Sequence, residues 1–268
     1  MENISIEKKL AEEYCKLFKL IENKPDWAFT KKTADELIHT AIPFIGKKYN
    51  ETKVLLYASA ENLSRYDGYL EKDSDALNRR RGTYNEMHNF FPDVHIAPVA
   101  DGSLLIVTAY ILNILGKTLQ YSTPHEFIEY IAVDNFCKFS IKSKANIDYA
   151  KDLEKIRYSL EYIKTDLELL KPEIMILPKT IYDHNEVKQL VRRIVPNCLV
   201  VPIYQINSRN INIRISKKYP KKKENTIDNL LVSWQKHPEF GLTGKTNENF
   251  YSVYTYLEDI IKHCTVIN

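Results

Sequence analysis

The stretch that indicates the fold most directly is Lys171-Pro-Glu-Ile-Met-Ile-Leu-Pro-Lys179. Its central residues are apolar, and charged residues stand on both sides of them. A short apolar run of this kind is typical of a strand that is buried on both faces, as in a parallel sheet. A second such run is Val200-Val-Pro-Ile-Tyr-Gln-Ile-Asn-Ser-Arg-Asn210, in which the apolar residues lead into a polar loop.

Two earlier stretches have the same form, Val54-Leu-Leu-Tyr-Ala-Ser-Ala-Glu-Asn62 and Tyr130-Ile-Ala-Val-Asp-Asn135. We therefore predict four strands that are neighbours in one parallel sheet, over residues 53–59, 131–136, 174–177 and 199–204. Open α/β sheets bind their ligands outside the carboxyl ends of the strands. The polar residues that follow these runs therefore predict a site at that edge.

Apolar residues at helical spacing occupy most of the remaining sequence. They predict helices over 5–22, after Thr33, over 103–115, from Pro124, and over 149–170, 185–194, 226–236 and 248–263. Residues 95–99 are a candidate short strand, and residues 63–92 predict a long polar loop. The alternation of strands and helices favours a single α/β domain over residues 1–268, with a central parallel sheet flanked by helices. Within it we expect an N-terminal helical segment (1–50), a core (53–215) and a C-terminal helical segment (216–268).

Composition excludes several classes of function. The 268 residues are 44% apolar and 27% charged, which fits a globular protein. With only 7 glycines, the chain has neither a GxGxxG nor a GxxxxGK[ST] phosphate loop. Its 4 cysteines form no CxxC pair, so we expect no metal site and no cofactor. The amino terminus lacks a signal-peptide pattern and no apolar run approaches ~20 residues, so we expect a cytoplasmic protein without a membrane partner.

The net charge of +3 does not by itself indicate a nucleic-acid partner. Basic residues nevertheless gather at Arg79-Arg80-Arg81, at Arg192-Arg193, and over Arg214, Lys217, Lys218 and Lys221-Lys222-Lys223. Runs of this kind usually form a solvated surface. They indicate contact with phosphates only where several of them converge on one surface.

The order of the strand ends resembles that of the uracil-DNA glycosylase superfamily, above all its mismatch-specific and single-strand-selective branches. Those enzymes carry a G-x-N-P-G type motif after the first core strand, and the matching segment here is Ala60-Glu-Asn-Leu-Ser64. A later family motif, H-P-S-P-R-N, matches Gln205-Ile-Asn-Ser-Arg-Asn210. The glycines and the proline of the first motif are absent here, and Gln205 replaces the His of the second. The resemblance covers residues 53–215.

The resemblance implies a uracil-DNA glycosylase-like fold and hydrolysis of the N-glycosidic bond of a damaged or deaminated base in DNA. It assigns the catalytic roles to Asn62, which would position water, to Glu61, as a weak general base, and to Gln205, as a donor to the leaving base. Asn135 would pair with the edge of the base, and Phe136 and Tyr66 would stack on it. The partner would be DNA, including single-stranded DNA, or a nucleotide, and the later motif would contact it through Asn207, Ser208 and Arg209. The basic run that follows the matched region adds Lys221, Lys222 and Lys223 as candidate phosphate contacts.

Each of these assignments has a purely structural alternative. Asn62 can cap a helix and Glu61 can be a solvated loop carboxylate. Asn135, Gln205 and Asn207 can bridge loop backbones, and the aromatic residues can belong to the core. The alternative function is a non-catalytic protein of the same fold that binds nucleic acid or a nucleotide. An unrelated α/β hydrolase has no support, because the chain has no G-x-S-x-G motif.

Overall fold

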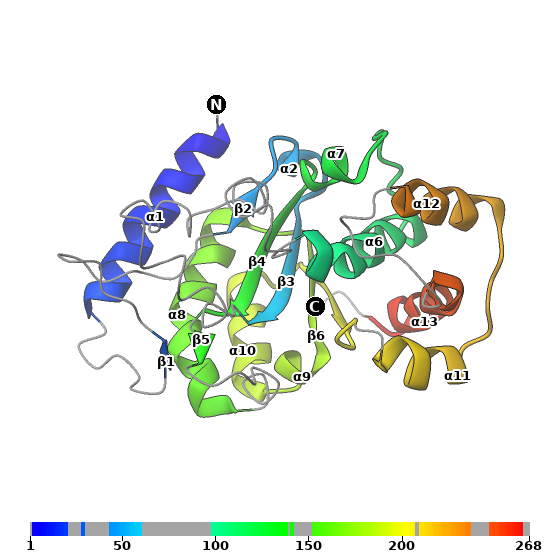
Figure 1. Ribbon diagram of the computed structural model, residues 1–268. Helices are drawn as coiled ribbons and strands as arrows, with labels where there is room; N and C mark the ends of the chain where they lie inside the picture. The colour runs from blue at the N-terminus through cyan, green and yellow to red at the C-terminus, as the bar shows by residue number, and fades with distance from the viewer. Residues whose placement is uncertain are drawn as a thin grey trace.

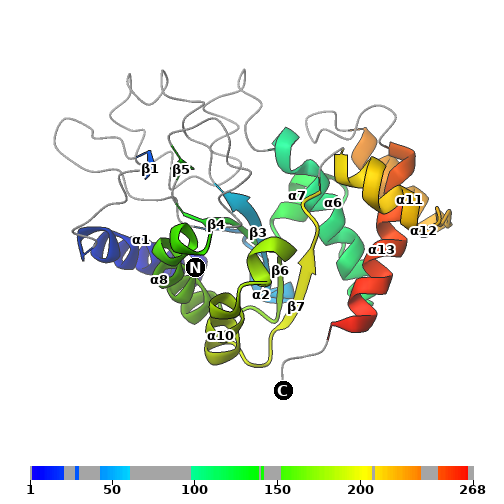
Figure 2. The same ribbon diagram turned by 90° about the horizontal axis from the view of Figure 1, so that it is seen from below.

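A computed structural model of the chain describes residues 2–20, 28–29, 43–60, 98–138, 140–141, 152–206, 209–236 and 247–264. Its centre is a five-stranded sheet in the order β2-β4-β3-β6-β7 (Figures 1 and 2). These strands are β2 (Phe44–Ile45), β3 (Val54–Ala60), β4 (Ile131–Cys137), β6 (Ile174–Pro178) and β7 (Leu199–Ile203). Only β2, at one edge, runs antiparallel to its neighbour, and the other four strands are parallel. The prediction of four neighbouring parallel strands is confirmed.

The register of the sheet explains why its strands are apolar almost throughout. Val54 is paired with Ile131 on one side and with Ile174 on the other, and Ile174 is paired with Leu199. Side chains alternate between the two faces of a strand. Leu56 therefore joins the core on one face and Leu55 the core on the other, and both are fully buried. With both faces covered, neither position tolerates a polar side chain without a partner.

Helices cover both faces of the sheet, as Figures 1 and 2 show from two directions. The first face is covered by α1 (Glu2–Leu20), α8 (Leu153–Leu170) and α10 (Asn185–Ile194). The second is covered by α6 (Pro98–Ile114), α7 (Pro124–Ile128), α12 (Asn225–Gln235) and α13 (Phe250–His263). The expected α/β architecture with flanking helices is therefore present.

Short elements complete the described chain. They are α2 (Tyr49–Thr52), α9 (Lys179–Tyr182), the π-helix η3 (Asn210–Ile215), α11 (Ser216–Lys218), the 3₁₀-helix η5 (Asn247–Asn249), and a separate antiparallel pair of β1 (Ala28–Phe29) and β5 (Ser140–Ile141). The predicted helix after Thr33 and the predicted loop over 63–92 lie outside the described residues.

Local chemistry fixes several boundaries that differ from the predicted ones. The helix expected from residue 149 begins at Leu153, because the Asp152 side chain caps it by accepting from the Lys155 N–H at 3.3 Å. The predicted short strand over 95–99 is wrong for residues 98–99, because α6 begins at Pro98. Proline favours the first helical position, where its fixed φ fits and no N–H is needed.

Gly46 lies where β2 approaches the residues before β4, and its N–H donates to the Ile131 carbonyl at 3.0 Å. A Cβ atom there would be 2.2 Å from the Glu129 carbonyl oxygen. We expect Gly46→Ala to lower the free energy of unfolding by roughly 2 kcal/mol or more, because this backbone cannot move aside cheaply. Gly116→Ala is the control. It strains a φ of +70° but meets nothing within 4 Å, and should cost only about 1 kcal/mol. Equal losses in urea denaturation would contradict the close approach.

Candidate functional site at the carboxyl edge of the sheet

The order of the strands reverses beside β3. The chain passes from β3 to β4 on one side, and then crosses to β6 and β7 on the other side. The helices that follow also diverge, since α6 covers one face and α10 the other. In open α/β sheets the ligand binds outside the strand ends at such a reversal. The candidate site therefore borders the ends of β3, at Ala60, and of β6, at Pro178.

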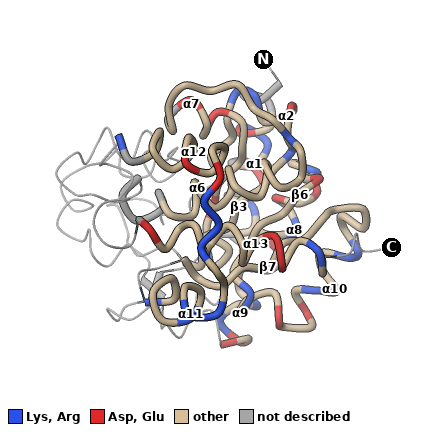
Figure 3. The backbone as a smooth tube through the Cα atoms, turned by 90° about the vertical axis from the view of Figure 1, so that its right-hand side faces the viewer, with Lys and Arg blue, Asp and Glu red and all other residues tan. Residues whose placement is uncertain are grey.

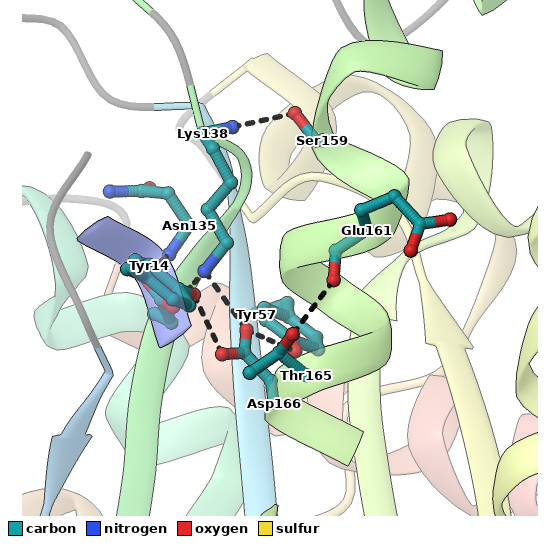
Figure 4. Close-up of polar contacts among 9 residues, drawn as sticks. Tyr14, Tyr57, Asn135, Lys138, Ser159, Glu161, Thr165 and Asp166 are labelled. Atoms are coloured by element: carbon teal, nitrogen blue, oxygen red, sulfur yellow. Dashed lines mark hydrogen bonds and ion pairs between the residues drawn. The ribbon is translucent and has the colours of Figure 1, made fainter. Parts of the chain in front are cut away.

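A buried ionic network lies beside this point, at the ends of β3 and β4 (Figure 4). The Lys138 ammonium group follows β4 directly and forms ion pairs with Asp134 of β4 and Asp166 of α8, the latter at 2.9 Å. The three side chains are 1%, 4% and 0% exposed, respectively. Buried charges of this kind are stable only when they are paired and hydrogen-bonded.

Two tyrosines complete the network through Asp166. The hydroxyl group of Tyr14 in α1 donates to Oδ1 at 2.6 Å, and that of Tyr57 in β3 donates to Oδ2 at 2.9 Å. Lys138 Nζ also lies 5.1 Å from the centroid of the Tyr14 ring, within cation–π range. The network thus joins four elements, α1, β3, β4 and α8.

The sequence brings these residues together by two ordinary periodicities. Tyr57 is the register partner of Asp134, so both side chains point to the face covered by α8. Asp166 lies on the buried stripe of α8, between Ile163 and Leu170 at helical spacing. Both acids therefore occupy positions that would otherwise hold apolar side chains.

Burial is the main cause of the pKa shifts in the network, and the presence of two acids beside one ammonium group adds to it. Burial raises the pKa of Asp134 to about 8, although Lys138 acts in the opposite direction. Burial alone would lower the pKa of Lys138, but Asp134 and Asp166 outweigh it and raise that pKa. Burial also raises the pKa of the Tyr14 and Tyr57 phenols, which stay neutral donors. The network is closed to solvent, so its direct effect is to hold the strand ends in place.

Two predicted site residues among the described ones, Asn135 and Phe136, directly contact this network. Asn135 is half-buried on β4, and its N–H donates to Asp134 Oδ1 at 2.7 Å. Strand alternation turns its side chain away from the face of Asp134. Phe136, predicted to stack on a base, is fully buried instead and packs edge-on against Tyr57 at 5.3 Å between ring centroids. In this structure Phe136 is therefore a core residue.

Gln205 lies at the same edge of the sheet but not next to Asn135. It follows β7, which is separated from β4 by β3 and β6. Strands are about 4.8 Å apart, so the two strand ends are roughly 14 Å apart. Gln205 is exposed, and its backbone carbonyl accepts from Asn210 Nδ2 at 2.7 Å. Arg209 is exposed directly before η3.

The three predicted lysine contacts are already engaged within the chain. Lys221 pairs with Glu248 at 2.8 Å, and Lys222 pairs with Glu258 at 2.7 Å. Lys223 Nζ lies 5.4 Å from the ring centroid of Tyr251. The remaining predicted site residues lie outside the described part of the chain: Glu61, Asn62, Tyr66, Asn207 and Ser208.

A hollow of about 390 Å³ lies at the opposite end of the strands, next to the amino ends of β6 and β7. We do not assign the site to it. Its lining includes Glu168, Glu173 and Asn197, near the carboxyl ends of α8 and α10. Helix carboxyl ends and glutamates both disfavour an anionic ligand. The strand order and the ionic network both favour the carboxyl edge.

The sequence interpretation missed Lys138, Asp134 and Asp166, although each carried a signal. Asp134 interrupts the apolar run of β4, and Asp166 interrupts the apolar stripe of α8. Charged residues are almost never fully buried unless they are paired. A charge at a core position therefore predicts a partner, but the sequence does not say which one.

Comparisons with protein-family models, with curated proteins and with solved structures give no match for this chain. Among the described residues, no group of three or more His, Cys, Asp or Glu side chains is arranged to hold a metal ion. None of the helices in the described ranges is both long and apolar enough to cross a membrane.

We expect Lys138→Met to destabilise the protein by roughly 3–5 kcal/mol, because it leaves the buried acids Asp134 and Asp166 without the ammonium group that both of them contact. Lys164→Met, on α8 in a partly exposed ion pair with Glu161 at 3.6 Å, should cost less than about 1 kcal/mol. Urea denaturation measures both. A loss for Lys138→Met no larger than that of the control would show that the ion pairs do not stabilise the fold.

The raised pKa of Asp134 predicts a definite dependence of stability on pH. The folded protein holds this proton more tightly than the unfolded chain, whose ordinary value is 3.8. The contribution to stability is therefore complete below about pH 4 and is lost as the pH rises through about 8.

Asp134→Asn should remove this loss, so stability between about pH 5 and about pH 8 should fall less steeply than in the unmodified protein. The control is Asp152→Asn, whose carboxyl has a lowered pKa and is ionised throughout that range. It should leave the slope unchanged. Parallel curves for the unmodified protein and Asp134→Asn would contradict the assignment.

Proposed function

We propose that the chain acts on a nucleobase of DNA, hydrolysing its N-glycosidic bond at the carboxyl ends of β3 and β6. The observation that carries this proposal is the reversal of strand order at β3, the strand that Glu61 and Asn62 follow in the sequence. The resemblance to uracil-DNA glycosylases assigns catalysis to the same two positions. Topology and motif thus support one location by separate arguments.

The chemistry required at this location matches the types of residue that follow β3 in the sequence and that β4 carries. Glycosidic cleavage develops positive charge on the sugar while the base departs as an anion, so it needs a positioned water and a donor to the base. Asn62 or Glu61 would hold the water. Asn135 offers both an acceptor and a donor to the edge of a base that has left the stack.

The buried ionic network supports the proposal as a device for positioning. Asp134 Oδ1 accepts the N–H of Asn135, and Lys138 ties Asp134 to α8. Groups that bind a reacting ligand must be held to within a fraction of an ångström. A network that fixes the backbone on both sides of Asn135 meets that requirement.

A non-catalytic protein that binds the same ligand is the second candidate, and Gln205 favours it. Gln205 replaces the family's His, and its neutral amide stabilises a departing anion less well than a charged donor does. Loss of one such donor typically costs on the order of 3 kcal/mol in the transition state. Slow chemistry or binding without turnover would both fit this residue.

A base-release assay separates the two candidates. Oligonucleotides that carry uracil, hypoxanthine or an oxidised pyrimidine, single- and double-stranded, are incubated with the protein and tested for abasic sites. For a catalyst, Asn62→Ala or Glu61→Gln should reduce the rate at least ~100-fold while oligonucleotide affinity changes little, since these groups act mainly in the transition state.

The matched control is Asn197→Ala, which removes an exposed amide at the opposite edge of the sheet and should leave the rate unchanged. Binding that depends on Asn135 without base release from any lesion would support the non-catalytic candidate. If no oligonucleotide is bound or cleaved, both candidates are wrong.

A further inference from the structure

Charge is distributed unevenly along the chain, and the excess of cations is concentrated after β7. Residues 205–223 contain seven Lys and Arg side chains and no carboxylate. Since the whole chain has a net charge of +3, the rest of it has a net charge of −4. A basic segment on a chain that is otherwise acidic favours an anionic partner for those of its cations that are not paired within the chain.

The fold presents part of this segment as a basic surface at the carboxyl edge of the sheet. η3 and α11 lie beyond the end of β7 (Figure 2), with Ile211 and Ile215 buried against the core. Arg209, Arg214, Lys217 and Lys218 are exposed on the outer side. We call these four residues the basic surface; Figure 3 shows the backbone at α11 as a blue stretch.

Internal contacts hold the basic surface in a fixed conformation. The Ser216 hydroxyl donates to the Asn212 carbonyl at 2.8 Å, within the turn that joins η3 to α11. Asn249 Nδ2 donates to Asn212 Oδ1 at 2.6 Å, which ties η3 to η5. A π-helical turn is rare and often accompanies a functional site. The cations therefore project from a supported scaffold.

Ion pairing separates five of the seven cations into two groups, while Lys218 and Lys223 each lie over a tyrosine ring, that of Tyr219 and that of Tyr251. Lys221 and Lys222 are neutralised by Glu248, Glu224 and Glu258 at 2.7–3.1 Å. By contrast, no carboxylate of the described chain forms a salt bridge with Arg209, Arg214 or Lys217. A cation already paired gains less from a phosphate than an unpaired one does, because its own partner must first be displaced.

We propose that the basic surface binds the phosphate backbone of a DNA strand, while Lys221 and Lys222 mainly fasten the segment to α13 and η5. The identification of the anion as DNA rests on the proposed function, because the basic surface and Asn135 lie at the same edge of the sheet. The surface contributes affinity without reading sequence, as phosphate contacts do.

The test uses a fluorescently labelled oligonucleotide without a lesion and measures its affinity by anisotropy over a series of KCl concentrations. Arg214→Gln/Lys217→Gln should weaken binding at low salt about tenfold and reduce the slope of log affinity against log salt by about 1.5, since each phosphate contact contributes ~0.7–0.9. Circular dichroism confirms folding of this variant, whose changed side chains are exposed.

Two control variants remove the same net charge elsewhere. Lys8→Gln/Lys9→Gln, exposed on α1, should change affinity less than about twofold. Lys221→Gln/Lys222→Gln should reduce the slope by less than the basic-surface variant does. Equal effects of all three variants would overturn the proposal, because binding would then follow net charge alone.

Undetectable oligonucleotide binding at low salt also overturns the proposal. A third contrary result is that Arg214 and Lys217 are needed for binding to phosphatidylserine vesicles or polyglutamate but not for binding to the oligonucleotide. Failure of the proposed function alone gives a result that differs from each of these. In that case no base is released and Asn135 is not needed, although DNA binding still depends on the basic surface.

Discussion

The Lys138 ammonium group is the constraint on which the carboxyl edge of this sheet depends. It is the cation for two buried carboxylates, one on β4 and one on α8, and Asp166 in turn receives the hydroxyl groups of Tyr14 and Tyr57. Apolar packing alone would permit small shifts of a helix over a sheet. Directional hydrogen bonds to buried charges do not, because any displacement leaves a desolvated charge without its partner. Such networks seldom add much stability compared with apolar residues of the same volume, so a role in positioning explains the presence of this one better than a role in stability.

This constraint suggests how the two proposals fit together on one edge of the molecule. The network holds the end of β4, which carries the half-buried Asn135, beside β3, whose end precedes Glu61 and Asn62 in the sequence. The basic surface lies beyond the end of β7, and β7 is the second strand from β3 on the side away from β4. A DNA strand that follows this edge would have its phosphates held at one end and a base presented at the other. Affinity and chemistry would then come from different elements, so each can be changed without the other.

The fold was predictable from the sequence to the extent that its signals are local. The strong amphipathic pattern over Asn185–Ile194 gave both boundaries of α10, and the apolar runs gave the four parallel strands. The two-residue strands β1, β2 and β5 are too short to have a period. The network was not predictable, since Tyr14 and Asp166 are 152 residues apart and only the tertiary structure pairs them. Phe136 was misjudged for a related reason: an aromatic residue near a strand end fits a ligand site and a core equally well, and its burial decides between them.

The most direct test of the central claim is a double-mutant cycle between Lys138→Met and Asp166→Asn, measured as free energies of unfolding. If the ammonium group organises this edge through its ion pairs, the two losses should not add. We predict a coupling energy of about 2 kcal/mol or more, near the upper end of the range for residues in one network. Losses that add to within about 0.5 kcal/mol would mean that Lys138 and Asp166 act independently. In that case the network would not be the device that holds β4 and α8 together.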